Sequence, residues 1–208
     1  MARAYLALGI AAALAACAPR PAAPPPDIAA PSGEGFLACQ EGLRSSGVVF
    51  EVLAPLHTRE GCGFNEGVKL KATPAPLNQP AVLSCPTALA LTRFDLDVVQ
   101  PAAQRHFGKA VMKIHHLGGY NCRGIVGTRK WSQHAYGNAI DVMGFDLADG
   151  TRITVSKDWR AGNARGAFLR DVAGGACKVF RVVLTPSYDR SHRDHFHLDL
   201  GPERLCGI

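Results

Sequence analysis

This sequence of 208 residues lacks several features that mark particular classes of protein. It has no run of lysine and arginine and no basic stretch interleaved with aromatic residues, although its formal net charge is +6. A solvated basic surface is therefore a better interpretation than a nucleic-acid interface, and no nucleic-acid partner is expected. It also has no internal repeat and no second hydrophobic span after the apolar N-terminal run, which argues against repeat proteins and multi-span membrane proteins.

The sequence also contains no Cys-x-x-Cys pair, which argues against a zinc site built from cysteines. Setting Cys17 aside leaves an even number of cysteines, which in an exported chain predicts disulfides, most simply three. Their pairing is not deducible from sequence, but Cys177 and Cys206 are favoured partners because they bracket a histidine-rich segment. The six candidates are Cys39, Cys62, Cys85, Cys122, Cys177 and Cys206.

Residues 1–16 are predicted to be a signal peptide, because their apolar run is shorter than the ~20 residues that span a bilayer. The tetrapeptide Leu14-Ala15-Ala16-Cys17 resembles a bacterial lipoprotein cleavage box, in which the cysteine becomes the lipidated N-terminus. This resemblance implies a lipid anchor on Cys17, and Ala18 rather than aspartate after it points to the outer membrane. An ordinary secretory signal with an incidental cysteine is the alternative.

The rest of the chain divides into two parts. Residues 17–32 are rich in proline and alanine and are expected to form an extended tether. Residues 33–208 are long enough for one domain with a real core.

Metal-competent side chains lie in two short motifs near the C-terminus. The first motif is Ser132-Gln133-His134-Ala135-Tyr136-Gly137-Asn138-Ala139-Ile140-Asp141, and the second is His192-Arg193-Asp194-His195-Phe196-His197-Leu198-Asp199. A His and an Asp seven residues apart, followed by a His-x-His, can supply two imidazoles and one carboxylate to zinc. The fourth position then stays open for water, as a catalytic zinc requires.

The spacing of the first motif argues against a helix, where residues seven apart are separated by about 10 Å along the axis. Two ligands with bonds of about 2 Å cannot share one ion at that separation. We expect a strand–turn–strand that turns at Gly137-Asn138 and brings Asp141 beside His134. The second motif alternates, which predicts a strand with one apolar face and one polar face. The polar face would carry His195, His197 and Asp199.

Strands and helices are mixed without regular βαβ alternation, which predicts an α+β fold with a mainly antiparallel central sheet and flanking helices. A short helix is expected from Phe36, followed by a strand at 48–53. Asp149-Gly150 is a hairpin signal, Pro101 is expected to break a helix over 87–107, and residues 74–80 are expected to be a connector. The other expected strands are 68–72, 110–115, 139–145, 153–155 and 179–185, with a helix at 163–172.

The motifs resemble those of known zinc peptidases. Ser132-x-His134-x-x-Gly137-x-Ala139-x-Asp141 resembles the first zinc motif of the D-alanyl-D-alanine carboxypeptidases and dipeptidases, and His192-x-x-His195-x-His197 is similar to the last motif of the penicillin-insensitive murein endopeptidases. These enzymes share a fold with lysostaphin-type peptidases and the hedgehog signalling domain. With Gly119-Tyr120-x-Cys122-Arg123 included, the arrangement most resembles the bacterial extensin-like C-terminal domain, over most of residues 35–208. The resemblance implies a hedgehog/DD-peptidase-like fold stapled by disulfides.

The resemblance also implies roles for single residues. His134, Asp141 and His197 would be the zinc ligands. Ser132 would support the site or contact substrate, and Arg123 would stabilise charge on the substrate or transition state. A structural ion pair is the alternative role for Arg123.

The acid–base group is less fixed by the resemblance. The carboxypeptidases carry glutamate where this chain has the shorter Asp194, whereas the endopeptidases use histidines at the positions of His192 and His195. Strand alternation places His195 on the ligand face, so His195 is the preferred acid–base group and Asp194 the alternative. His192 and Asp199 are expected to support the site, with Asp199 orienting a ligand histidine.

The function implied is zinc-dependent hydrolysis of peptide bonds in the stem or cross-link of peptidoglycan, by a carboxypeptidase or an endopeptidase. The expected location is the periplasmic face of the bacterial envelope. The alternative is a non-catalytic zinc-binding envelope lipoprotein that binds the cell wall or a protein partner, because fold alone does not fix function.

Overall fold

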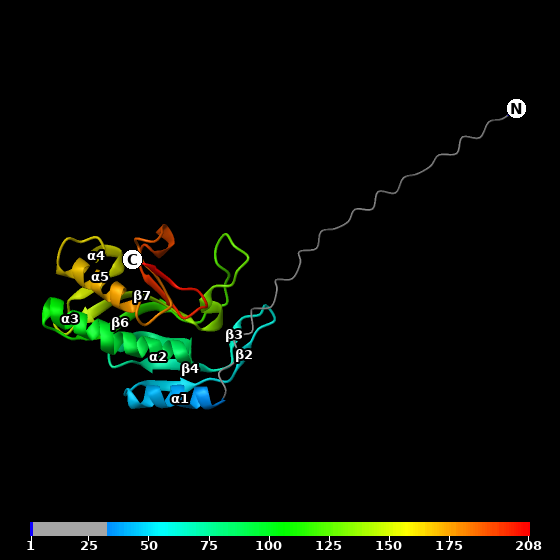
Figure 1. Ribbon diagram of the computed structural model, residues 1–208, viewed down its shortest axis with the longest axis horizontal. Helices are drawn as coiled ribbons and strands as arrows, with labels where there is room; N and C mark the ends of the chain where they lie inside the picture. The colour runs from blue at the N-terminus through cyan, green and yellow to red at the C-terminus, as the bar shows by residue number, and fades with distance from the viewer. Residues whose placement is uncertain (2–32) are drawn as a thin grey trace.

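The computed structural model describes Met1 and residues 33–208 (Figure 1). The predicted signal segment after Met1, the lipidation candidate Cys17 and the tether over 17–32 lie outside the described residues. Within residues 33–208, nine strands form one sheet, most of whose pairings are antiparallel, and helices accompany it. The predicted α+β class with a mainly antiparallel sheet is confirmed.

The sheet has the strand order β1-β4-β5-β6-β7-β10-β9-β11, with β8 paired to β7, and β2 and β3 form a separate two-stranded ribbon. Two pairings are parallel, β5 with β6 and β9 with β11. The strands are β1 (Val49–Val52), β2 (Leu56–His57), β3 (Gly63–Phe64), β4 (Gly67–Ala72), β5 (Pro76–Ser84), β6 (Val111–Gly118), β7 (Ala139–Leu147), β8 (Arg152–Thr154), β9 (Val182–Leu184), β10 (Phe196–Asp199) and β11 (Leu205–Gly207).

The helices carry much of the apolar core. They are α1 (Gly33–Ser45), α2 (Cys85–Arg93), the π-helix η1 (Phe94–Val99), α3 (Gln100–Phe107), the 3-10 helix η2 (Gln133–Tyr136), α4 (Val155–Asp158), α5 (Ala164–Ala176) and the 3-10 helix η3 (Arg190–His192). None of these described helices combines the length and apolar character needed to cross a membrane. Phe94, Leu91 and Phe168 are fully buried among them, in one core with Ile140 and Phe196 of the sheet.

The alternation of β7 and β10 separates this core from a polar surface. Ile140 and Val142 of β7 pair with Leu198 and Phe196 of β10, and all four side chains join the core. The residues between them point to the other side of the sheet, because successive strand side chains alternate in direction. Asp141 and His197 therefore lie together on the side of the sheet away from this core.

The helix expected over 87–107 forms, but Pro101 does not break it. Figure 1 shows α2 and α3 as one continuous green helix. The helix passes through η1, where the backbone N–H of Gln100 donates to the carbonyl of Asp95, five residues back. This wider turn sits just before Pro101, whose missing N–H falls in the first turn of α3, where proline is tolerated.

Residues 74–80 are mostly strand rather than the predicted connector, which corrects that prediction. β5 begins at Pro76, where an N–H is not needed to start the strand. Pro80 lies where the β4 pairing is irregular, because the register shifts between the Ala72–Pro76 pair and the Leu70–Ala81 pair. The two prolines occupy the positions in a strand that can accept them.

Three disulfides join parts of the fold, as predicted, and the favoured Cys177–Cys206 pair is one of them. Cys39–Cys85 ties α1 to the start of α2, and Cys177–Cys206 ties the end of α5 to β11. Cys62–Cys122 links the β2–β3 ribbon to the loop that carries Arg123. Because Arg123 directly follows Cys122, this bond restrains the residue that reaches Asp141 on the polar side of β7.

Candidate metal centre

Asp141 and His197, two of the three predicted metal ligands, face each other across neighbouring strands. β7 and β10 are antiparallel, and their register places His197 directly opposite Asp141. Cross-strand partners on one face have Cβ atoms about 4.5–5.5 Å apart, close enough for their side chains to meet. The Nδ1 atom of His197 lies 3.0 Å from Oδ1 of Asp141.

His134 comes from η2 instead of the strand that the sequence predicted. The Ser132 hydroxyl caps this helix by accepting the His134 N–H at 3.3 Å. Gly137 ends the helix in the left-handed conformation with φ of 67°, and the chain then enters β7. The expected turn at Gly137 is present, but a single 3-10 turn precedes it, which brings His134 back over Asp141.

Backbone and carboxylate contacts fix which nitrogen each histidine presents. Nδ1 of His134 lies 2.6 Å from the carbonyl oxygen of Gly119, so Nδ1–H donates and Nε2 faces the cluster. Nε2 of His197 lies 2.9 Å from Oδ2 of Asp199, so Nε2–H donates and Nδ1 faces the cluster. Such outer contacts orient histidine ligands in metal sites.

The three donor atoms converge in a buried group. Nε2 of His134 lies 3.1 Å from Oδ1 of Asp141 and 3.2 Å from Nδ1 of His197. His134, Asp141 and His197 are all buried, and their ligand atoms lie within 4.8 Å of one another. The three residues form a group that could hold a metal ion.

The protonation of His197 and the ionisation of Asp141 stabilise this group. Burial lowers the pKa of His197, but hydrogen bonds and charge from Asp141 and Asp199 outweigh it and raise the pKa to about 9. Burial raises the pKa of Asp141, yet the imidazoles of His134 and His197 hold it well below its ordinary value. An ionised carboxylate therefore lies between two imidazoles, and a metal cation would replace the proton on His197.

His195 and Asp194 act as a pair at the edge of the group. Nδ1 of His195 lies 2.9 Å from Oδ1 of Asp194, so Nδ1–H donates to that carboxylate. The other ring nitrogen, Nε2, lies 3.7 Å from Oδ1 of Asp141. The structure thus turns His195 toward the cluster and places the Asp194 carboxylate on the other side of the ring.

A second histidine–aspartate pair, His192 with Asp189, lies beside the first. Nδ1 of His192 lies 2.8 Å from Oδ1 of Asp189, which also caps η3. The His192 ring centroid lies 5.3 Å from that of His195 and 5.8 Å from that of His197. Burial lowers the pKa of His192 although Asp189 opposes that effect. The sequence analysis did not predict a role for Asp189. Its position three residues before His192, where aspartate is a favoured N-cap, is the sequence pattern that could have indicated one.

Arg123 is brought to the cluster from a separate loop. Its Nη2 lies 3.8 Å from Oδ2 of Asp141, and its side chain is half exposed. A cation beside the carboxylate and open to solvent can approach a bound ligand.

Gly119 is a second contributor that the sequence reasoning did not assign. A Cβ at Gly119 would lie 2.4 Å from the carbonyl oxygen of Val82, so only glycine fits. Its carbonyl sets the orientation of His134. The Gly118-Gly119 pair at the end of β6 is the sequence signal for this close approach.

A comparison with protein-family models identifies the domain. The model described as extensin-like protein C-terminus matches residues 37–207, which include the whole cluster and all six disulfide cysteines. The chain belongs to this family. A search of curated proteins and a search of solved structures gave no match. The extensin-like resemblance expected from the Gly119–Arg123 segment and the two motifs is confirmed.

Proposed function

We propose that this extensin-like domain is a zinc-dependent peptidase that cleaves peptide bonds in peptidoglycan, as a carboxypeptidase or an endopeptidase. The observation that carries the proposal is the convergence of two imidazoles and one carboxylate, with a further imidazole nitrogen 3.7 Å from that carboxylate. Three protein ligands leave a position for water or substrate, which separates catalytic from structural zinc sites. The resemblance of both motifs to cell-wall peptidases supports the substrate class.

The donor set suits zinc. Bonds of about 2.0–2.1 Å at tetrahedral angles separate neighbouring ligand atoms by roughly 3.3 Å. The three donor–donor distances of 3.0 to 3.2 Å are close to that value. Nitrogen and carboxylate oxygen are ordinary zinc ligands, and Gly119 and Asp199 supply the outer contacts that such histidines usually have.

The protein groups around the ion would move protons and balance charge. Bound zinc would polarise the scissile carbonyl and lower the pKa of a water to about 7. His195 would accept a proton from the attacking water at Nε2 and pass it to the leaving amine. Its Nε2 is free for this because the hydrogen bond to Asp194 keeps the other proton on Nδ1. Arg123 would offset negative charge as it develops on the carbonyl oxygen. Asp194 in this scheme positions His195 and is not itself the base.

Export and anchoring are part of the proposal. The N-terminal apolar run and Leu14-Ala15-Ala16-Cys17 support a lipoprotein held at the outer membrane and facing the periplasm. Three disulfides fit an oxidising compartment. Metabolic labelling with a radioactive fatty acid tests this directly. Label should enter the wild-type protein and be lost in Cys17→Ala, and label in both proteins would refute the anchor.

The test of activity is mass spectrometry of purified peptidoglycan incubated with the zinc-loaded protein. New muropeptides are expected with the wild type and not with Asp141→Asn. The control is Asp146→Asn, since Asp146 lies on the same strand but pairs with Arg152 and His115 instead.

Zinc content is measured in the same three samples. Stoichiometric zinc without new muropeptides would reject the peptidase and favour a binding protein. Absence of zinc from the wild type after loading would reject the metal assignment itself.

A further inference from the structure

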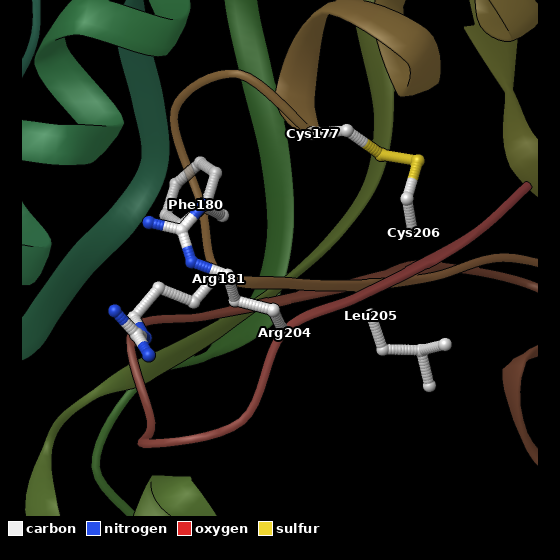
Figure 2. A pocket seen from close by; sticks show the side chains of 6 residues that line it. All are labelled: Cys177, Phe180, Arg181, Arg204, Leu205 and Cys206. Atoms are coloured by element: carbon white, nitrogen blue, oxygen red, sulfur yellow. A yellow bond between two sulfur atoms is a disulfide. The ribbon is translucent and has the colours of Figure 1, made fainter.

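A small hollow lined by two arginines lies between the starts of β9 and β11, and none of its lining residues belongs to the metal group. Its volume is about 220 Å³. Figure 2 shows both arginine side chains extending to the same side, away from the disulfide in the wall. The lining residues are Cys177, Phe180, Arg181, Arg204, Leu205 and Cys206.

The fold places these two arginines side by side. β9 and β11 are parallel, with Leu205 opposite Val182, and the Leu205 N–H donates to the carbonyl of Arg181 at 2.9 Å. Arg181 directly precedes Val182, and Arg204 directly precedes Leu205. Their backbones are therefore neighbours about 4.8 Å apart, and their side chains lie on the same face. Like charges at facing positions on adjacent strands repel each other and destabilise the pair.

No carboxylate relieves this repulsion in the described part of the chain. None of the salt bridges within residues 33–208 includes Arg181 or Arg204. The two acidic residues that precede Arg204 most closely along the chain have other partners. Glu203 lies 3.8 Å from Lys130, and Asp199 accepts hydrogen bonds from His197 and the Gly201 N–H. The hollow therefore has two positive charges and no anionic side chain in its lining.

The guanidinium of Arg181 also has one N–H donor without an acceptor among the described residues. Nη2 of Arg181 donates to the carbonyl of Pro202 at 2.6 Å, which holds the side chain in place. Its Nε is buried and has no hydrogen-bond partner among the described residues. A buried donor without an acceptor is costly, so a ligand oxygen that reached this N–H would relieve that cost.

We propose that this hollow binds a phosphate group, either inorganic phosphate or the end of a phosphate monoester. Guanidinium groups bind phosphate oxygens through paired N–H donors, and a phosphate carries about −1.5 to −2 charges at pH 7, which matches two arginines. The volume is below the roughly 300–1,000 Å³ of pockets for drug-sized ligands, so it suits one headgroup. The Cys177–Cys206 bond, with Cα atoms 5.7 Å apart, ties the two walls together before a ligand arrives.

The test is calorimetry of the full-length protein after metal removal with a chelator, so that phosphate cannot bind through a metal ion. Inorganic phosphate, methyl phosphate and acetate are titrated at matched ionic strength. Phosphate and methyl phosphate should both bind the wild type, and acetate should bind at least tenfold more weakly. Binding of inorganic phosphate alone would restrict the site to the free ion and overturn the monoester part.

Matched variants locate the site. R204Q should weaken phosphate binding about tenfold or more, because one charged hydrogen-bonding group is lost. Arg204 is exposed, so its replacement leaves the core intact, and R204K should recover only part of the affinity because lysine lacks the planar fork. The control is R59Q, since Arg59 is an exposed arginine on the β2–β3 loop. The proposal is overturned if the wild type binds no phosphate, or if R59Q weakens binding as much as R204Q.

Discussion

His197 presents its two ring nitrogens to different partners, and this division controls how it can bind a metal. Nε2–H donates to Asp199, which leaves Nδ1 facing Asp141 and His134. In the proposed zinc site, Asp199 would therefore act through His197 as a positioning residue. Its own carboxylate is held in place by the Gly201 N–H at 2.8 Å.

Replacement of this carboxylate tests that role. Asp199→Asn should weaken zinc binding by about 10- to 100-fold, because the amide no longer accepts a charged hydrogen bond in the same way. Affinity is measured by competition with a chromogenic chelator. Asp189→Asn, which alters the contact of a non-ligand histidine, is the matched control. Equal zinc affinity in Asp199→Asn and the wild type would remove Asp199 from the site.

The pair of His195 and Asp194 predicts unequal losses of activity. His195→Ala should lower kcat by about 10²- to 10⁴-fold, the usual contribution of a general acid–base group. Asp194→Asn should lower it less and leave KM unchanged, because the imidazole stays in place but its orientation and tautomer are less well fixed. Steady-state kinetics on a muropeptide substrate measure both. A larger loss in Asp194→Asn would make Asp194 the base, with zinc content as the control for both variants.

Zinc binding should also depend on pH. Asp141 and Asp199 raise the pKa of His197 to about 9, so this ring carries a proton at neutral pH that zinc must displace. Since the proton competes with the metal only below that pKa, zinc affinity should rise with pH between about 6 and 9 and level off above. The slope should be about tenfold per pH unit for one displaced proton. Calorimetry in buffers of different ionisation enthalpy measures it, and a flat profile would contradict the prediction.

At the scale of elements, Gly137 is the point where η2 becomes β7. Its φ is 67°, its carbonyl accepts the Ser84 N–H at 2.8 Å, and a Cβ there would lie 2.8 Å from that nitrogen. Both the conformation and the space thus require glycine. This junction sets the distance between His134 and Asp141.

Two alanine substitutions separate the cost of the left-handed backbone conformation from the cost of the steric clash. Gly150→Ala, at φ of 81° with nothing within 4 Å of the new Cβ, should cost about 1 kcal/mol from backbone conformation alone. Gly137→Ala should cost about 2 kcal/mol or more, because the clash with Ser84 adds to that strain. Urea unfolding measures both. Equal losses would mean that Ser84 moves away freely.

At the scale of the whole molecule, the Cys62–Cys122 bond holds the site to a distant part of the chain. It closes a separation of 60 residues and fixes the loop that carries Arg123. Long-range closure of this kind typically contributes about 2–5 kcal/mol to stability. The double variant Cys62→Ser, Cys122→Ser should lose about 2–5 kcal/mol of unfolding free energy, and its urea midpoint should fall accordingly.

The same variant should also weaken activity more than metal binding. None of the three candidate ligands lies in the tethered loop, whereas Arg123 does, so zinc content should change little in the folded protein while KM rises. The double variant Cys177→Ser, Cys206→Ser is the comparison, since that bond lies at β11. Equal effects of the two variants on KM would show that Arg123 is not positioned by its neighbouring disulfide.

The sequence alone determined the chemistry available and much of the local structure. The spacing of His134 and Asp141, the alternation of His195, His197 and Asp199, and the even number of cysteines outside Cys17 are all local or compositional patterns. They predicted the α+β class, three disulfides and the family. Such patterns are readable because strand periodicity and turn residues act over a few positions.

Only the tertiary structure decided what depends on distant parts of the chain. The β7–β10 register brings His197 opposite Asp141, Gly119 selects the nitrogen of His134, and β9 and β11 place Arg181 beside Arg204. The π-helical turn before Pro101 and the strand through Pro76 and Pro80 depend likewise on neighbouring packing. Each arises from contacts between residues far apart in sequence, whose energies outweigh the local preferences from which a sequence is interpreted.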